Sequence, residues 1–384
     1  MAHATYQDLI RHVLDYTGAE VSKAGERLAR RAVQAAYRDV AAARAWSYYQ
    51  VRGRIATVAQ QTTGTVAYDH TGGAHERLLT LTSATWPDWA GYGTVVIANV
   101  AYDVEERKSS TTLTLAEATN PGADVASGTS YTLYRDNYAL PADFAEIGEV
   151  VLTDNDWPVS YVTPQEWLQL QRVRQGPGTP RHFTIQGEAS YQGALAIRFF
   201  PPPDTARQVD FLYKKRPRDL ALEEYSTGTV TVSNGSAAVT GSGTAWDSSM
   251  EGAVIRFSSG STSVPTGRGG DHPYRLERRV LDVTGATALT LDSAVTEAFS
   301  GVKYSISDPA DIEEGAMLNY LLRECEHQAR VVRRMEPTRT ELASHRQAQV
   351  LAFEADSRSF AKRAAGGRHL YRPRLRDMPV DLSS

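Results

Sequence analysis

Two stretches of this 384-residue chain, residues 55–136 and 225–308, resemble one another segment by segment. Both are rich in Thr, Gly and Val, and their apolar residues alternate with polar ones, as in half-buried β-strands. The matching segments, first copy before second, are TGTV at 63 and 227, Trp86 and Trp246, GTVV at 93 and GAVI at 252, YDVEER at 102 and YRLERR at 274, TLTL at 112 and ALTL at 288, and GTSYTLYRD at 128 and GVKYSISDP at 301. A repeat of about 80 residues can close as a small barrel or sandwich. The sequence therefore predicts two copies of one β module.

Helices are predicted at both ends of the chain. Apolar residues at 6, 9, 10, 13 and 14 form one stripe that stops at Gly18, and an Ala-rich second helix follows over 22–45. Near the other end, Asp308 is the predicted N-cap of a helix with an apolar stripe from Leu318 to Val332. Thr338 and Glu341 form a capping box for a last helix that ends at residues 366–367.

The middle of the chain predicts about five antiparallel strands and a short helix that opens with Pro164. Neither pair of terminal helices has a covering partner of its own, so we expect both pairs to pack with this sheet. The predicted fold class is α+β: a discontinuous core of N- and C-terminal helices and a small antiparallel sheet, with two inserted all-β modules. The predicted divisions are core helices over 1–54, the first inserted module over 55–136, the core sheet over 137–224, the second inserted module over 225–308, core helices over 309–365 and an extended basic C-terminal arm over 366–384.

Composition narrows the function classes. The formal net charge of −4 gives no global attraction to nucleic acid, so any such binding must come from a local patch. The single cysteine, Cys325, excludes an intrachain disulfide and a Cys-based zinc site. This cysteine content is compatible with a chain that folds in a reducing cytoplasm. We expect Cys325 to be a buried structural thiol. No run of 18 apolar residues occurs, so no membrane partner is predicted.

No catalytic, cofactor-binding or metal-binding pattern is found. The nine histidines are scattered, no H-E-x-x-H or G-x-S-x-G motif occurs, and the Gly-rich segments lack the Lys-Ser/Thr of a phosphate loop. The sequence therefore predicts a protein that is not an enzyme and holds no cofactor or metal.

One local charge feature stands out near the C-terminal end. Residues 358–376 contain seven Lys or Arg and no Asp or Glu, with aromatic and apolar residues between them. Two interpretations remain open: a solvated basic tail, or an arm that folds onto a partner with Arg and Tyr as anchors. Direct DNA binding by this segment is less favoured, because no recognised DNA-binding fold accompanies it.

The whole layout resembles the head-to-tail adaptor proteins of tailed bacteriophages, the connector or tail accessory rings. The segments that carry the resemblance are the aromatic cluster Trp46, Tyr48 and Tyr49, YALPADFAEIGEVV from 138, VSYVTPQEW ending at 167, PRHFTIQG, FFPPP and VDFLYKKRPRDL. The β modules resemble small domains inserted in phage neck and tail proteins, and the presence of two departs from the plain adaptor.

The resemblance implies a structural virion protein at the head–tail junction. It implies a homo-oligomeric ring, commonly of twelve subunits, that binds the portal protein, extends the DNA channel without sequence-specific binding, and presents a platform to a downstream tail or neck protein. In such adaptors the C-terminal segment commonly reaches the portal. The candidate portal contacts are Arg368, Tyr371, Arg372, Arg374 and Arg376.

Two alternatives remain. The protein can be a tail-tube terminator or stopper ring instead. It can also be a glycan- or host-surface-binding module, in which Trp86, Trp89 and Trp246 act as stacking platforms, although a tryptophan retained in the core of each module explains the matching pair more simply.

Overall fold

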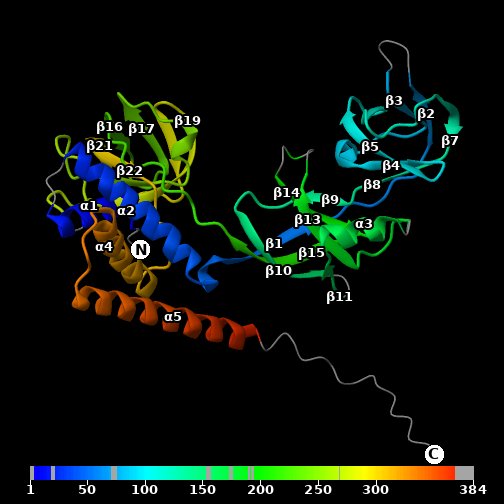
Figure 1. The fold of residues 1–384 in the computed structure, drawn as a ribbon. Coiled ribbons are helices and arrows are strands. Elements are labelled where there is room, and N and C mark those ends of the chain that lie inside the picture. Colours follow the sequence, from blue (N-terminus) through cyan, green and yellow to red (C-terminus); the bar gives the residue numbers. More distant parts are fainter. Residues whose placement is uncertain are drawn as a thin grey trace, which may run out of the picture. The chain divides into compact units, whose positions relative to one another are not determined.

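The computed structural model describes residues 4–18, 22–70, 76–152, 157–172, 176–188, 191, 194–267 and 269–367. These residues form helices and several antiparallel sheets, two of them curled, so the protein is a mixed α+β protein with β modules. The chain divides into two compact units, one of Met1–Tyr49 with Pro217–Ser384 and one of Gln50–Arg216 (Figure 1). No helix in the described part is long and apolar enough to span a membrane.

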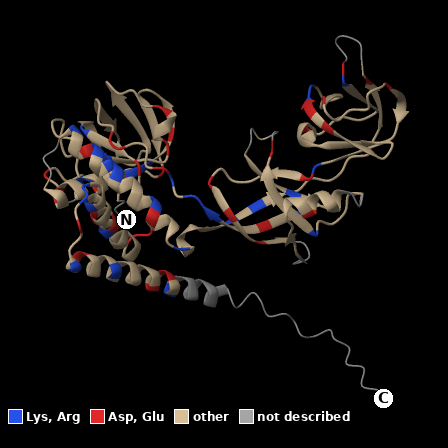
Figure 2. Cartoon of the chain, viewed as in Figure 1, with Lys and Arg blue, Asp and Glu red and all other residues tan. Residues whose placement is uncertain are grey.

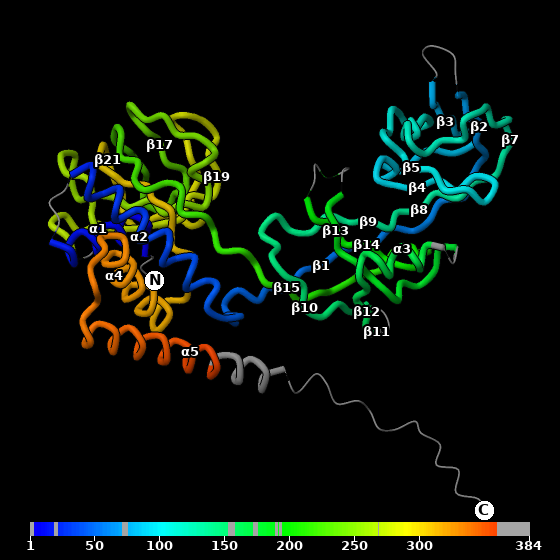
Figure 3. Tube along the Cα trace, viewed as in Figure 1, coloured from blue at the N-terminus to red at the C-terminus, as the bar shows by residue number. Residues whose placement is uncertain are grey.

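Helices from both ends of the sequence build the first unit: α1 is Tyr6–Thr17, α2 is Lys23–Ala42, α4 is Ala316–Val332 and α5 is Arg339–Gly367. α1 ends at Gly18, whose φ of 57° is left-handed, as the sequence predicted. Its predicted apolar stripe is buried. α2 packs against α1 and α4, and Figure 3 shows these three helices side by side. Small residues of α2, including Ala32 and Ala36, let the helices approach closely.

The predicted N-cap at Asp308 is wrong, because Asp308 has other partners. Its carboxylate accepts hydrogen bonds from Arg218 at 2.8 Å and from the backbone N–H groups of Ala221 and Leu222. These contacts satisfy a carboxylate that is almost fully buried. The helix begins later, at Ala316, and Cys325 within it is buried, which raises the pKa of its thiol.

The two curled sheets have the same strand order. In the second unit the order is β7-β2-β3-β6-β5-β4-β8, and in the first unit it is β21-β16-β17-β20-β19-β18-β22. The strands of the former are β2 Thr65–Asp69, β3 Leu78–Thr82, β4 Thr94–Ile97, β5 Val100–Arg107, β6 Thr112–Leu115, β7 Val125–Thr129 and β8 Tyr131–Tyr134. The strands of the latter are β16 Thr229–Val232, β17 Ala238–Ser242, β18 Val254–Phe257, β19 Leu276–Gly285, β20 Ala288–Leu291, β21 Phe299–Val302 and β22 Tyr304–Ser307.

Strand pairing corrects two of the segment matches. Val104 pairs with Leu115 and Val280 pairs with Leu291, so the structural counterpart of YDVEER begins at 278, four residues after YRLERR. Val95 pairs with Leu133 and Ile255 pairs with Ile306, so the structural counterpart of GTVV begins at 253, one residue after GAVI. The reason for the displacement at β19 is the connection before it: two residues join β4 to β5, whereas residues 258–275 join β18 to β19. The residues paired across the strands therefore define which positions of the two sheets correspond, and the sequence similarity of YRLERR to YDVEER does not.

The middle segment forms two four-stranded sheets where one was predicted. The orders are β1-β15-β10-β11 and β12-β13-β14-β9, and β12 pairs with β13 in parallel. The strands are β1 Gln50–Ala56, β9 Asn137–Ala139, β10 Phe144–Leu152, β11 Trp157–Pro158, β12 Ser160–Tyr161, β13 His182–Gly187, β14 Leu195–Phe200 and β15 Gln208–Lys215, with α3 at Pro164–Arg172. β1 was counted with the N-terminal helices, but it pairs with β15 along its whole length.

The predicted joint core of helices and middle sheet is not confirmed. The helices bury one hydrophobic cluster, in which Trp46, Leu321 and Ala352 take part, and the two middle sheets bury another around Phe199 and Phe211. The helices cover one another, so they need no sheet to bury their apolar faces. The sequence could not show this, because both arrangements satisfy the same apolar patterns.

Candidate functional site

The predicted portal contacts, Arg368, Tyr371, Arg372, Arg374 and Arg376, lie outside the described residues. α5 leads into them directly in the sequence. The contacts that hold α5 therefore define where the candidate arm starts, and they form the site described below.

A capping box begins α5, as the sequence predicted. Thr338 N donates to Glu341 Oε2 at 2.8 Å, and Glu341 N donates to Thr338 Oγ1 at 3.3 Å. These bonds satisfy backbone N–H groups that have no partner within the helix. They also fix the Glu341 carboxylate in the first turn of α5.

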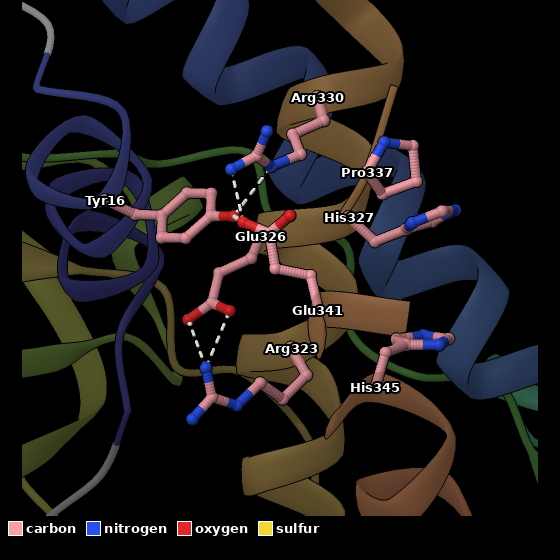
Figure 4. A pocket seen from close by; sticks show the side chains of 8 residues that line it. All are labelled: Tyr16, Arg323, Glu326, His327, Arg330, Pro337, Glu341 and His345. Atoms are coloured by element: carbon pink, nitrogen blue, oxygen red, sulfur yellow. Dashed lines mark hydrogen bonds and ion pairs between the residues drawn. The ribbon is translucent and has the colours of Figure 1, made fainter. Parts of the chain in front are cut away.

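Glu341 joins α5 to α1 and α4 through Tyr16 and Arg330 (Figure 4). The Tyr16 hydroxyl donates to Glu341 Oε1 at 2.6 Å, and Arg330 Nε donates to the Tyr16 oxygen at 2.9 Å. Arg330 also pairs directly with Glu341. Hydrogen bonds from Thr338 and Tyr16 lower the pKa of Glu341 to about 2, while burial raises the pKa of Tyr16.

Histidines and carboxylates continue this polar junction along α4. His345 of α5 pairs with Glu324, and its ring stacks on His327 with centroids 5.2 Å apart. Arg323 and His12 both contact Glu326, at 2.8 Å and 3.1 Å. Each buried or half-buried carboxylate here thus has a cationic or hydrogen-bonding partner.

Aromatic and ionic contacts hold the next turns of α5. The ring of Phe353 packs edge-on to Trp46 at 5.5 Å, and Arg44 donates to the Phe353 carbonyl at 3.0 Å. Asp356 is almost fully buried, pairs with Arg44 at 3.1 Å and accepts from Ser47 N at 2.8 Å. α5 is therefore anchored from Glu341 to Asp356, over about four turns, and its direction is set before the chain leaves the described part.

The space enclosed by this junction is small. The hollow between Tyr16, Arg323, Glu341 and their neighbours has a volume of about 10 Å³, room for one water at most. Within the described residues, no three His, Cys, Asp or Glu side chains are placed to bind a metal ion. The arrangement can orient a helix.

Trp86 and Trp246 are both buried, with 1% and 4% of their surface exposed. Trp86 packs edge-on to Tyr131, and Trp246 packs edge-on to Tyr304. Each tyrosine hydroxyl donates to a backbone carbonyl, that of Thr63 at 2.8 Å and that of Thr227 at 2.6 Å. Buried rings offer no face to a sugar, so the burial favours the core interpretation over the stacking one.

Sequence reasoning missed Arg256, which joins the second curled sheet to α1. Its side chain is 3% exposed, pairs with Asp8 at 2.7 Å and Glu277 at 3.3 Å, and lies over the ring of Tyr274. Strand pairing makes it the counterpart of Val96. The only available signal was a charged residue where the matching strand has an apolar one.

Part of the chain resembles a known protein family. Residues 75–234, less than half of the chain, match the sequence model of a family described as SU10 adaptor protein. No curated protein matches the chain. The match suggests a phage adaptor-type protein with a structural role, and it implies a component of the virion.

Proposed function

We propose that this protein forms an oligomeric ring that joins the portal vertex of a bacteriophage head to the tail and extends the DNA channel. The observation that carries the proposal is the match of residues 75–234 to the SU10 adaptor family. The ring most consistent with the resemblance has twelve subunits, with the portal protein on one side and a tail or neck protein on the other.

The helices of the first unit supply surfaces suited to ring contacts. Val350 and Leu351 of α5 are 53% and 47% exposed, and Val331 and Met335 at the end of α4 are about half exposed. A ring needs a heterologous interface between unlike faces of neighbouring subunits. Apolar side chains that a subunit leaves uncovered support such an interface.

We also propose that residues 55–136 and 225–308 are two copies of one module inserted into an adaptor chain. Their shared strand order supports this proposal. The same Trp–Tyr–carbonyl contact in both copies supports it further.

The portal contact can be tested by co-sedimentation with assembled portal rings. We expect Arg368→Gln, Arg372→Gln and Arg374→Gln together to weaken attachment at least about tenfold, because each removes a charge-assisted contact. A matched triple change at exposed arginines outside the arm, Arg52→Gln, Arg54→Gln and Arg275→Gln, should leave attachment unchanged. Equal attachment by wild type and the arm variant would place the portal contact elsewhere.

A further inference from the structure

Helix α2 carries a row of basic side chains on its exposed face. Lys23, Arg27, Arg31 and Arg38 are exposed and follow one another at intervals of four, four and seven residues. At 3.6 residues per turn these positions fall within an arc of about 80°. In Figure 2, Lys and Arg recur along α2. We call these four residues the α2 basic row.

The row contains no carboxylate, and one of its side chains is engaged within the helix: Arg27 Nε donates to the backbone carbonyl of Lys23 at 3.3 Å. Glu26 of α2 lies about 60° from Lys23 around the helix axis and pairs with Arg30 at 3.5 Å, and Asp39 accepts a hydrogen bond from Gln328. Within the described residues, the ion pairs of α2 are those of Arg30 with Glu26 and Glu223. Four cations concentrated on a chain with a formal net charge of −4 form a local positive field.

A shallow recess lies at the C-terminal end of the row, between Arg31 and Arg38. It has a volume of about 450 Å³ and is lined by Arg31, Gln34, Ala35, Arg38 and Val332. Guanidinium groups are weakly hydrated and bind phosphate oxygens in a bidentate manner, so two of them beside a concave surface suit a phosphate chain.

The row lacks the features of a protein-docking surface. Besides the two arginines, the recess is lined by Gln34, Ala35 and Val332 and by no aromatic residue, whereas protein interfaces have an apolar, often aromatic, centre. Protein–DNA interfaces are instead polar and strongly positive. From Lys23 to Arg38 the helix rises about 22 Å, which spans roughly six phosphates of one strand of duplex DNA.

We propose that the α2 basic row contacts the phosphate backbone of duplex DNA without reading its sequence. The biological setting, DNA passing an adaptor ring, rests on the proposed function, but the chemistry of the row does not. Each phosphate neutralised by an arginine releases counterions, so binding must weaken as salt rises.

The test compares full-length wild type with Arg31→Gln/Arg38→Gln, using the fluorescence anisotropy of a labelled 30-base-pair duplex over a range of salt concentrations. The matched control is Arg339→Gln/Arg346→Gln, which removes two exposed arginines from α5. We expect the α2 variant to bind at least about tenfold more weakly at 0.1 M salt. We expect the slope of log K against log [salt] to fall by about 2, and the control to match wild type.

Three results would overturn the proposal. The α2 variant can bind DNA as wild type does, both double variants can lose affinity equally, or the α2 variant can lose affinity for poly-glutamate but not for DNA, which would assign the row to an acidic protein. Circular dichroism checks that each variant is folded. Mass photometry of the same samples reports ring formation, so loss of DNA binding by an intact ring leaves the proposed function standing.

Discussion

At the residue scale, Gly64 and Gly228 hold the same backbone position in the two curled sheets. Each is the second residue of a TGTV segment and directly precedes a strand, β2 or β16, and their φ angles are 90° and 86°. A Cβ at Gly64 would lie 2.5 Å from the carbonyl oxygen of Thr82, and a Cβ at Gly228 would meet that of Ser242. The glycines therefore repeat because both sheets need the same close approach of two chains.

We expect Gly228→Ala to lower the free energy of unfolding by about 3 kcal/mol, because the new methyl group combines left-handed strain with a backbone clash. Chemical denaturation followed by tryptophan fluorescence measures the change. The matched control is Gly235→Ala, which has a φ of 78° but no heavy atom within 4 Å, and should cost about 1 kcal/mol. Equal losses in the two variants would contradict the clash.

Arg256 makes buried ion pairs, and its replacement can be compared with that of an exposed arginine. We expect Arg256→Met to cost about 3–5 kcal/mol, because it removes a charged partner from Asp8 of α1 and from the buried Glu277 carboxylate. Arg275→Met is the control: Arg275 is 60% exposed and pairs with Glu297 at 2.7 Å, so its loss should cost about 0–1 kcal/mol. A loss below about 1 kcal/mol at Arg256 would contradict its assigned role in joining the sheet to α1.

At the element scale, the start of α5 depends on an ionised Glu341. Its pKa is lowered from the ordinary glutamate range to about 2, so its stabilising contribution is complete above about pH 4.5 and is lost as pH falls toward 2. We expect Glu341→Gln to lower the Tm at pH 7. The difference from wild type should shrink as pH falls from about 4.5 toward 2, as measured by thermal melts in a pH series.

The control for this prediction is Glu354→Gln on the same helix. Glu354 is exposed and pairs only with Arg358 among the described residues. The Glu354→Gln substitution removes the same charge as Glu341→Gln but affects no contact with α1 or α4. Its effect on the Tm should therefore be small at every pH. A pH-independent loss at Glu341 would show that its ionisation does not hold α5.

The exposed side of α5 carries a prediction that rests on the ring proposal. We expect Val350→Asp/Leu351→Asp to abolish ring formation while the subunit stays folded, because buried carboxylates at an interface are costly. Sedimentation velocity measures the assembly. Leu281→Asp changes an equally exposed apolar residue on β19 and should leave assembly unchanged. Normal rings from the α5 variant would exclude this face from the interface.

At the scale of the whole molecule, the sequence predicted elements better than it predicted their partners. The stripe of α1, the capping box of Thr338 and Glu341, and the strands of the middle segment follow from local patterns. The pairing of β1 with β15 and the separate clusters of helices and middle sheets depend on contacts far apart in the sequence, which local patterns do not encode.

The candidate site was predictable only in part. The capping box fixed Glu341 in the first turn of α5, but no spacing rule connects Glu341 to Tyr16 or Arg330 in advance. Arg256 gave a weaker signal still, since the sequence alignment of the two modules was out of register at that strand. Tertiary contacts, which have no periodicity, decide both features.

The central claim is that this chain assembles into the ring between portal and tail. Negative-stain electron microscopy of the purified protein, alone and mixed with its portal, tests it most directly. The account predicts rotationally symmetric rings, commonly of twelve subunits, that stack coaxially on the portal. A folded monomer that leaves portal rings bare under the same conditions would contradict the account.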